Sequence, residues 1–319
     1  MTAPALDELI AGAIALEKWP LARLVRLFED ARPEAVPGKA AAIAALEAHG
    51  ALPRAMVAGF TGTPGSGKST LVGELAARMV ARDPAISVAV LAIDPSSYRS
   101  GGSILGDRTR VHFPIGERRL YFRSQPSDRE LGGIGRATYP VVRVLERLFD
   151  YVFVETVGIG QSEVEVERLA DRVYLVLQPL GGDHIQFMKA GIMEVPHAFI
   201  LNKCDVGAAA RRSYHALRAS IDFARPGEAS PPPIFRTSAL SGEGLDDVLA
   251  DLVAHRTLRD AAGRRERDRY FFEKWVRDEY GRFGLDLLER QGGAEGLLAR
   301  AATFEAAQAA YRPPVAPPG

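Results

Sequence analysis

Cysteine is almost absent from this chain, which has one, Cys204, in 319 residues. A single thiol excludes an intrachain disulfide framework and a zinc site built from several cysteines, so the fold must depend on a hydrophobic core. No apolar run approaches the roughly 20 residues that span a bilayer. Residues 1–19 carry acidic residues and no basic segment before their apolar run, unlike a secretory signal peptide. We therefore expect a cytoplasmic protein with no membrane partner.

The sequence also lacks an excess of either charge. It has 40 basic and 40 acidic residues and a formal net charge of zero. Proteins that bind nucleic acid through the phosphates usually carry a net positive surface, so we expect no nucleic-acid partner. The 6 histidines form no H-x-x-x-H pair, which disfavours metal transport as the function.

Three regions differ in their hydrophobic pattern. Residues 1–50 carry apolar residues at three- and four-residue spacing, which predicts a helical N-terminal extension. Residues 51–256 alternate between short apolar runs and helix-patterned stretches. Residues 257–312 return to a helical pattern, and the proline-rich residues 313–319 are expected to form a disordered tail.

The alternating region predicts an α/β domain. Strands of a parallel sheet are covered on both faces, and they therefore appear as continuous apolar runs between helices. We expect a mostly parallel sheet flanked by helices. Its predicted strands are Ala55–Phe60, Val88–Ile93, Tyr151–Val154, Val173–Leu177, Ala198–Leu201 and Ile234–Thr237.

A phosphate-binding loop follows the first predicted strand. Residues 62–69 fit G-x-x-x-x-G-K-[S/T] at every fixed position, and a helical pattern follows. Glycines let backbone N–H groups surround a phosphate, and the helix directs its positive end toward the anion. We expect Lys68 to contact the β- and γ-phosphates and the Ser69 hydroxyl to ligate Mg²⁺. The predicted nucleotide contacts here are Gly62, Pro64, Gly65, Ser66, Gly67, Lys68, Ser69 and Thr70.

A second motif predicts which base is bound. Asn202-Lys203-Cys204-Asp205 follows a predicted strand and fits N-K-x-D. The Asp205 carboxylate can accept the N1–H and 2-amino hydrogens of guanine, whereas adenine would leave these acceptors unpaired at about 1–3 kcal/mol each. Asn202 is expected to join this loop to the phosphate loop, and the Lys203 stem to cover the purine. Three further residues are predicted to contact guanine O6 through the backbone: Ser238, Ala239 and Leu240.

Carboxylates at strand ends predict a magnesium site. Glu155 follows a predicted strand in E-T-V-G, where most GTPases have D-x-x-G, and Asp94 and Asp107 follow the preceding predicted strand. Mg²⁺ takes few protein oxygens besides phosphates and water, so these three carboxylates and Ser69 are sufficient. We expect the Gly158 N–H to contact the γ-phosphate. Turn formation by Asp94 and helix capping by Asp107 are the structural alternatives.

The predicted hydrolytic residues are Lys68, Asp94, Asp107, Glu155 and Gln161, the last of which could orient water or only make an ordinary hydrogen bond. No arginine finger is assigned, although three arginines, Arg99, Arg108 and Arg110, lie in the loop after the second predicted strand. Without an arginine finger, the rate of GTP hydrolysis is roughly 10³–10⁵-fold lower. We therefore expect slow intrinsic GTP hydrolysis that a partner accelerates.

Taken together, D-P-S-S-x-x-S-G-G-S-I-L-G-D-R-T-R, E-T-V-G-I-G-Q-S-E and N-K-C-D resemble the MeaB/ArgK family over about residues 54–255. These proteins are GTPase chaperones of adenosylcobalamin-dependent acyl-CoA mutases, related to the human methylmalonic aciduria type A protein. The resemblance implies a P-loop GTPase domain, an N-terminal helical extension and a C-terminal helical arm that forms a homodimer. It also implies GTP/GDP and Mg²⁺ as ligands. The implied partner is a mutase, whose cofactor loading the GTPase gates and which the GTPase protects or reactivates.

The resemblance also implies an additional switch at Gly181–Gln186 and Lys189. Family members commonly have an acidic residue where His184 stands and a lysine where Ala190 stands. These departures favour a partner other than the methylmalonyl-CoA enzyme. An aromatic stripe from Phe272 to Phe283 fits either an intramolecular core or a dimer contact, and the resemblance favours the dimer.

Three rival functions remain at this point. A metallochaperone GTPase would share the fold but should carry a histidine-rich tract or a Cys/His cluster. A small-molecule kinase would share the phosphate loop but would not need the N-K-x-D motif. A scaffold without turnover would be unaffected by the loss of Lys68.

Overall fold

We describe the fold from a computed structural model of the chain. The structure describes residues 3–94, 116–127, 134–156, 162–179, 192–228, 230–256 and 261–313. The chain divides into two compact units, each made of segments that are separated in sequence. The helical unit comprises Met1–Arg54, Arg136–Leu148 and Arg259–Gly319, and the sheet unit comprises Ala55–Gly135 and Phe149–Leu258.

The sheet unit is built on a seven-stranded sheet in the order β3-β2-β4-β1-β5-β6-β7, and every strand pairing in it is parallel. The strands are β1 (Met56–Gly62), β2 (Val88–Asp94), β3 (Leu120–Pro126), β4 (Tyr151–Thr156), β5 (Arg172–Leu177), β6 (Ala198–Leu201) and β7 (Ile234–Arg236). All seven therefore present their carboxyl ends at one edge, where ligands of open α/β sheets bind.

Six of the strands match the predicted apolar runs to within two residues at each end. The interior strands β1, β2, β4, β5 and β6 are buried along their whole length. β3 was not predicted, because it lies at the edge and its sequence includes Arg123, Ser124 and Gln125. An edge strand is covered less completely, so its sequence need not be a continuous apolar run.

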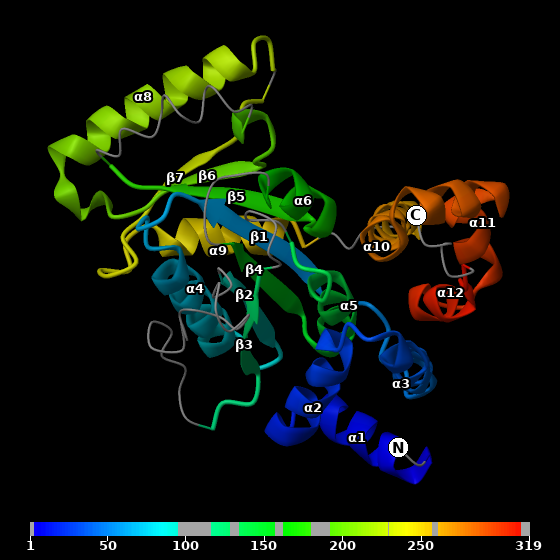
Figure 1. Cartoon of the computed structure of the whole chain (residues 1–319). Helices are drawn as coiled ribbons and strands as arrows, with labels where there is room; N and C mark the ends of the chain where they lie inside the picture. The colour runs from blue at the N-terminus through cyan, green and yellow to red at the C-terminus, as the bar shows by residue number, and fades with distance from the viewer. Residues whose placement is uncertain are drawn as a thin grey trace, which may run out of the picture. The chain divides into compact units, whose positions relative to one another are not determined.

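Helices cover both faces of this sheet (Figure 1). On one face, α4 (Lys68–Arg82) and α9 (Leu245–Ala254) pack on a core in which Phe60 stacks on Tyr174 at 5.1 Å between ring centroids. On the other face, α8 (Ala208–Ala224) buries Leu217 and Ile221 against β5 and β6. The described residues of the sheet unit also form three shorter helices: α6 (Ser162–Leu169), η3 (Ile192–Glu194) and η4 (Cys204–Val206).

The helical unit combines both ends of the chain with one internal helix. Its members are α1 (Ala3–Ile14), α2 (Lys18–Glu29), η1 (Pro33–Ala35), α3 (Val36–Ala48), α5 (Thr138–Leu148), α10 (Ala261–Arg290), α11 (Gly293–Arg300) and α12 (Phe304–Ala310). Within it, α3 packs on α12, and α2 packs on α5. The path of α10 breaks at Gly281, where φ is +60°.

The aromatic stripe of α10 makes contacts inside this unit. Phe272 and Val276 are fully buried, and the rings of Phe272, Trp275 and Tyr280 surround Tyr311 at 5.7–6.1 Å between centroids. Phe283, by contrast, is 41% exposed. The first part of the stripe therefore contributes to an intramolecular core, whereas the dimer contact stays a prediction.

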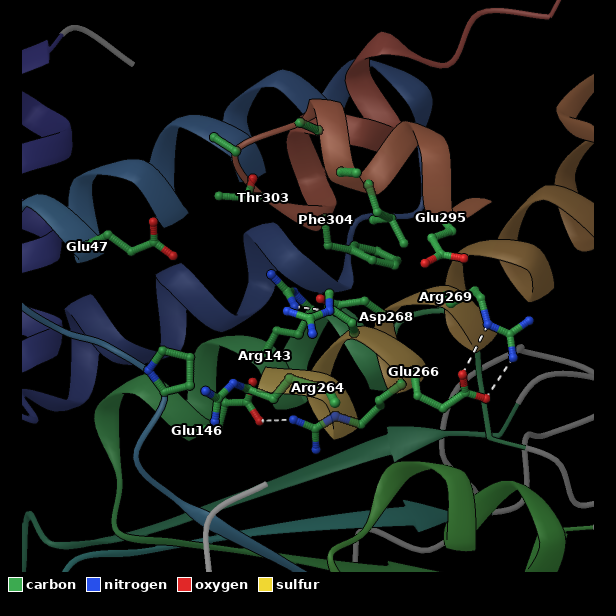
Figure 2. A pocket seen from close by; sticks show the side chains of 18 of the residues that line it. Glu47, Arg143, Glu146, Arg264, Glu266, Asp268, Arg269, Glu295, Thr303 and Phe304 are labelled. Atoms are coloured by element: carbon green, nitrogen blue, oxygen red, sulfur yellow. Dashed lines mark hydrogen bonds and ion pairs between the residues drawn. The ribbon is translucent and has the colours of Figure 1, made fainter. Parts of the chain in front are cut away.

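Buried ion pairs join α5 to the C-terminal helices. Arg143 Nε donates to Glu305 Oε1 at 2.7 Å and Arg143 Nη1 donates to Asp268 Oδ1 at 2.6 Å. Glu305 is completely buried, and Tyr139, whose pKa is raised by burial, donates its hydroxyl hydrogen to Asp268. Buried charges are tolerated only when they are paired in this way. Figure 2 shows Arg143, Asp268 and Phe304 lying together, from α5, α10 and α12.

A cavity of about 680 Å³ lies within the helical unit (Figure 2). Its lining contains guanidinium and carboxylate groups of both signs, and several of them pair with one another. Arg143 pairs with Asp268, Arg269 with Glu266, and Arg267 with Glu146. These pairs neutralise much of the charge in the cavity, whereas the carboxyl edge of the sheet carries the predicted nucleotide-binding motifs.

The prediction of an α/β fold with a mostly parallel sheet and helical segments at both ends of the chain is confirmed. Within the part of the chain that the structure describes, no helix has the length and hydropathy of a membrane-spanning segment.

Replacing the buried Glu305 should destabilise the helical unit. Glu305→Ala removes one of the two carboxylates that pair with the buried Arg143, and breaking such a pair costs about 3–5 kcal/mol. Both tryptophans, Trp19 and Trp275, belong to this unit. Urea unfolding followed by tryptophan fluorescence should therefore show a lower midpoint at unchanged slope.

The matched control is Arg32→Ala, which breaks a solvent-exposed ion pair with Asp30 in the same unit. Exposed pairs contribute little to stability, so its midpoint should stay close to that of the unmodified protein. Equal midpoints for the two variants would contradict the role given to Glu305.

Candidate functional site

The phosphate loop connects β1 to α4 and has the backbone shape that its glycines allow. Gly62 has φ +139°, and a Cβ there would lie 2.0 Å from the Val176 carbonyl oxygen. Gly67 has φ +85°, and a Cβ there would lie 2.7 Å from Asn202 Nδ2. Side chains at these two positions would therefore strain the backbone and collide with neighbouring loops.

Lys68 begins α4, and its ammonium crosses the loop. Its Nζ donates to the Gly62 and Thr63 carbonyl oxygens at 2.9 Å each, and the side chain is buried. These contacts hold a positive charge beside the loop and the N-terminus of α4, both of which attract phosphate. The contact of Lys68 with the β- and γ-phosphates stays a prediction, with which this position is compatible.

Oxygen ligands lie beside the loop at the ends of β2 and β4. Ser69 Oγ donates to Glu155 Oε1 at 2.6 Å. Asp94 is buried at the end of β2 and accepts a hydrogen bond from the Ser124 hydroxyl. Since Ala92 pairs with Glu155, the two carboxylates belong to adjacent strands. Hydroxyl and carboxylate oxygens are the ligands that Mg²⁺ prefers, so Ser69, Asp94 and Glu155 fit that ion.

A hydrogen bond also joins the strands on which these groups lie. Thr156 Oγ1 donates to Thr61 Oγ1 at 3.0 Å, and both threonines are buried. Thr61 precedes the phosphate loop, and Thr156 follows Glu155. The contact therefore ties the end of β4 to the start of the loop.

The N-K-x-D loop is attached to the phosphate loop through Asn202. Its Nδ2 donates to the Ser66 carbonyl oxygen at 2.9 Å. Its Oδ1 accepts from the Ala239 backbone N–H at 3.1 Å and from Thr237 Oγ1 at 3.2 Å. Asn202 is buried, so one side chain holds three loops together.

Lys203 and Asp205 occupy different settings in that loop. Lys203 has φ +62°, and its Nζ donates to the Gly65 carbonyl oxygen at 2.6 Å and to Gln178 Oε1 at 3.0 Å. Asp205 is exposed in η4, so its carboxylate is accessible to a base. The half-buried Cys204 donates its thiol hydrogen to the Leu201 carbonyl oxygen, and burial raises the pKa of the thiol. A protonated thiol is a poor nucleophile.

The third loop, Ser238–Leu240, follows β7. Ser238 N–H donates to the Glu243 carbonyl oxygen at 3.0 Å, and the Gly242 N–H donates to the Ser238 carbonyl oxygen at 2.8 Å. Ala239 is buried, whereas Leu240 is 87% exposed. This loop is therefore a closed turn that lies against the N-K-x-D loop and exposes Leu240 to solvent.

Several predicted site residues lie outside the residues that the structure describes. These are Asp107, Gly158 and Gln161, the arginines Arg99, Arg108 and Arg110, and the predicted switch residues Gly181–Gln186 and Lys189. The described residues bring together Lys68, Ser69, Asp94 and Glu155 at the phosphate end. They bring Asn202, Lys203 and Ala239 together at the base end.

Several side chains that contact the predicted site residues were not predicted from the sequence. Gln178 contacts Lys203, Ser124 contacts Asp94, and the threonine pair links β1 to β4. Gln178 directly follows β5, so its position at a strand's carboxyl end was an available signal. Ser124 lies in the edge strand that was not predicted, and for this residue the sequence offered no comparable signal.

Comparison with known proteins decides the family. Residues 21–280 match the family described as methylmalonyl Co-A mutase-associated GTPase MeaB. The chain belongs to this family. A protein of Caulobacter vibrioides is 36% identical over 266 residues, which cover 82% of this chain and 79% of that protein. GTPase ArgK of Escherichia coli is 38% identical over 216 residues, which cover 65% of this chain and 63% of that protein.

A solved structure has the same fold. The crystal structure of a LAO/AO transport system kinase superposes with a TM-score of 0.63 at 25% identity, and the match covers 91% of both chains. The predicted P-loop NTPase fold, the MeaB/ArgK family and the prediction of a GTPase are confirmed. As a member of this family the protein binds guanine nucleotide, whereas the individual site residues stay predictions.

Gly67→Ala should disrupt the nucleotide site. The new methyl group would lie 2.7 Å from Asn202 Nδ2 at a residue with φ +85°. We expect GDP affinity to fall at least about tenfold, because Asn202 must shift and its three buried hydrogen bonds weaken. Isothermal titration with GDP would measure the loss.

Gly227→Ala is the matched control for the backbone effect. Gly227 has a similar φ of +79° but open space around the position of a Cβ. This variant should bind GDP like the unmodified protein. If both variants lost affinity equally, the contact between Gly67 and Asn202 would not be the cause.

Proposed function

We propose that this protein is a GTP-hydrolysing chaperone of an adenosylcobalamin-dependent acyl-CoA mutase. In this function it gates the loading of the mutase cofactor and protects or reactivates the mutase. The observation that carries the proposal is the family match over residues 21–280, whose description names a mutase-associated GTPase. Support for guanine as the base comes from Asn202, which joins the phosphate loop to the N-K-x-D loop.

We propose that GTP binds with its phosphates around Gly62–Ser69 and its base beside Asn202, Asp205 and Ala239. Lys68 contributes positive charge to the β- and γ-phosphates, since its ammonium lies across the loop. Asp205 accepts the N1–H and 2-amino hydrogens of guanine. Backbone N–H groups of the Ser238–Leu240 loop are the corresponding donors to guanine O6.

We also propose Mg²⁺ as the metal ion, held by Ser69, Asp94 and Glu155 together with the nucleotide. The ion would neutralise charge on the β- and γ-phosphates. The hydrogen bond from Ser69 to Glu155 places hydroxyl and carboxylate oxygens together beside Lys68. Asp107, which follows the same strand as Asp94 in the sequence, is proposed as a further ligand.

Slow intrinsic turnover is part of the proposal. Phosphoryl transfer depends on positioning and charge stabilisation, and an arginine finger contributes about 10³–10⁵ in rate. No arginine is assigned this role from the sequence, so we propose that the mutase accelerates hydrolysis by ordering the loops at the γ-phosphate. Gln161 is the residue proposed to orient the attacking water.

Residues 51–256 are proposed as the G domain, and residues 257–312 as a C-terminal arm that forms a homodimer. The exposed Phe283 on α10 supports the dimer, because a large apolar side chain at a subunit contact would lose its exposure. The cytoplasm is the proposed location. A metallochaperone role on the same fold remains the alternative, and direct calorimetric titration with Ni²⁺ would favour it if it gave tight binding.

A small-molecule kinase is a second candidate function, because one similar structure is that of a LAO/AO transport system kinase. A kinase that phosphorylates a small molecule would have no need for a guanine-specific loop. The N-K-x-D loop, which Asn202 holds against the phosphate loop, therefore favours the GTPase chaperone over the kinase.

Asp205→Asn should change the preferred base from guanine to xanthine. An asparagine amide can donate to the C2 carbonyl of xanthine but cannot accept both hydrogens of guanine. Where mismatched hydrogen bonds are buried, selectivity falls by about 10⁴-fold. Because Asp205 is exposed, we expect the preference for GDP over XDP to fall by about 10²-fold. Competition between GDP and XDP, measured with a fluorescent GDP analogue, would quantify the change.

Asp222→Asn is the control, since Asp222 is exposed on α8 in the same unit. It should leave the preference for guanine unchanged. If the unmodified protein bound ADP as tightly as GDP, the assignment of the base pocket would be wrong.

The partner should be detectable through turnover. We expect one adenosylcobalamin-dependent acyl-CoA mutase, tested among several that include the methylmalonyl-CoA enzyme, to bind in a GTP-analogue-dependent pull-down. The same mutase should raise the rate of GTP hydrolysis at least about tenfold, a small part of what a supplied finger achieves. Lys68→Ala should abolish the stimulation. Hydrolysis at tens per second without any partner would contradict the proposal.

A further inference from the structure

Lys203 has a backbone conformation that needs support from its surroundings. Its φ is +62°, in the left-handed region that a residue with a Cβ adopts only at a cost. Residues in such conformations persist where neighbouring groups hold them, and they cluster at functional sites. The groups that hold Lys203 are therefore important for the site.

Two acceptors from different segments hold the Lys203 ammonium. Nζ donates to the Gly65 carbonyl oxygen at 2.6 Å and to Gln178 Oε1 at 3.0 Å. Gly65 contributes a backbone atom, which a substitution cannot remove. Gln178 contributes a side chain, so its contact can be tested directly.

The backbone at Gln178 is held in place by the sheet. It directly follows β5, which lies between β1 and β6 in the sheet. The preceding Leu177 accepts the Asn202 backbone N–H at 2.8 Å, so the backbone at Gln178 is tied to the N-K-x-D loop. Its amide is neutral, so it accepts from Lys203 without cancelling the positive charge.

We propose that Gln178 is a positioning residue of the guanine site. Its amide oxygen and the Gly65 carbonyl oxygen together fix the Lys203 ammonium. The aliphatic stem of Lys203 is thereby held in one position, as a surface against which the purine face packs. Without Gln178 the stem would sample other rotamers, and the bound nucleotide would leave faster. The inference rests on the proposed guanine site and adds one residue to it.

The test measures release of N-methylanthraniloyl-GDP from the full chain by stopped flow. Gln178→Met keeps the length of the side chain and removes the acceptor, and it should speed release about 5- to 10-fold, the effect of one hydrogen bond. Gln178→Glu keeps an acceptor for the ammonium and should release no faster than the unmodified protein. Gln291→Met, an exposed glutamine in the helical unit, is the matched control and should have no effect.

A double-mutant cycle with Lys203→Ala separates positioning from a general structural role. If Gln178 acts through Lys203, Gln178→Met should change the release rate less than twofold in the Lys203→Ala background. An equal acceleration in both backgrounds would overturn the proposal, as would a Gln178→Met rate within twofold of the unmodified protein. If Lys203→Ala binds the nucleotide too weakly for its release to be followed, the test is the comparison of Gln178→Met with Gln178→Glu. Equal acceleration of release in these two variants would also overturn the proposal.

Failure of this inference can be distinguished from failure of the proposed function. If the unmodified protein does not discriminate GDP from ADP, the guanine site itself is wrong. If it does discriminate, and Gln178→Met leaves release unchanged, only the role of Gln178 is wrong.

Discussion

The side-chain amide of Asn202 connects three loops that are far apart in the chain. It donates to Ser66 in the phosphate loop and accepts from Thr237 and Ala239 after β7. Because the amide is buried, each of these hydrogen bonds would cost about 1–3 kcal/mol if a partner were left unsatisfied. The phosphate loop, the N-K-x-D loop and the loop after β7 are therefore constrained to keep one arrangement. The same constraint explains why position 67 requires glycine, since any Cβ there would meet this amide.

Different interactions organise the two units. The sheet unit places polar loops at the carboxyl ends of buried parallel strands, where side chains from distant segments converge. The helical unit instead holds its pieces together with buried charges. Arg143 of α5 is paired with Asp268 of α10 and Glu305 just inside α12. Removing these charges from water is costly, so the pairing also restricts which arrangement of the three helices is stable.

Much of the fold could be predicted from local patterns. Six strands were recognised because buried parallel strands are continuous apolar runs, and α4 was expected because the phosphate loop precedes a helical pattern. β3 escaped because Arg123, Ser124 and Gln125 interrupt its pattern at the sheet edge. α5 shows a different limit. Its helical pattern carries no sign that it belongs with the two ends of the chain rather than with the segments that flank it.

The identity and order of the chemical groups follow directly from the amino-acid sequence. The phosphate loop, the N-K-x-D motif and the family follow from residue types at short, fixed spacings, which local backbone geometry enforces. Which of these groups come into contact depends on how the chain folds in three dimensions. The contacts of Ser69 with Glu155, Asn202 with Ser66, Lys203 with Gln178 and Arg143 with Glu305 span from 25 to 162 residues of sequence. They depend on strand order, register and helix packing, which arise from burial of the whole chain and leave no periodic signal along it.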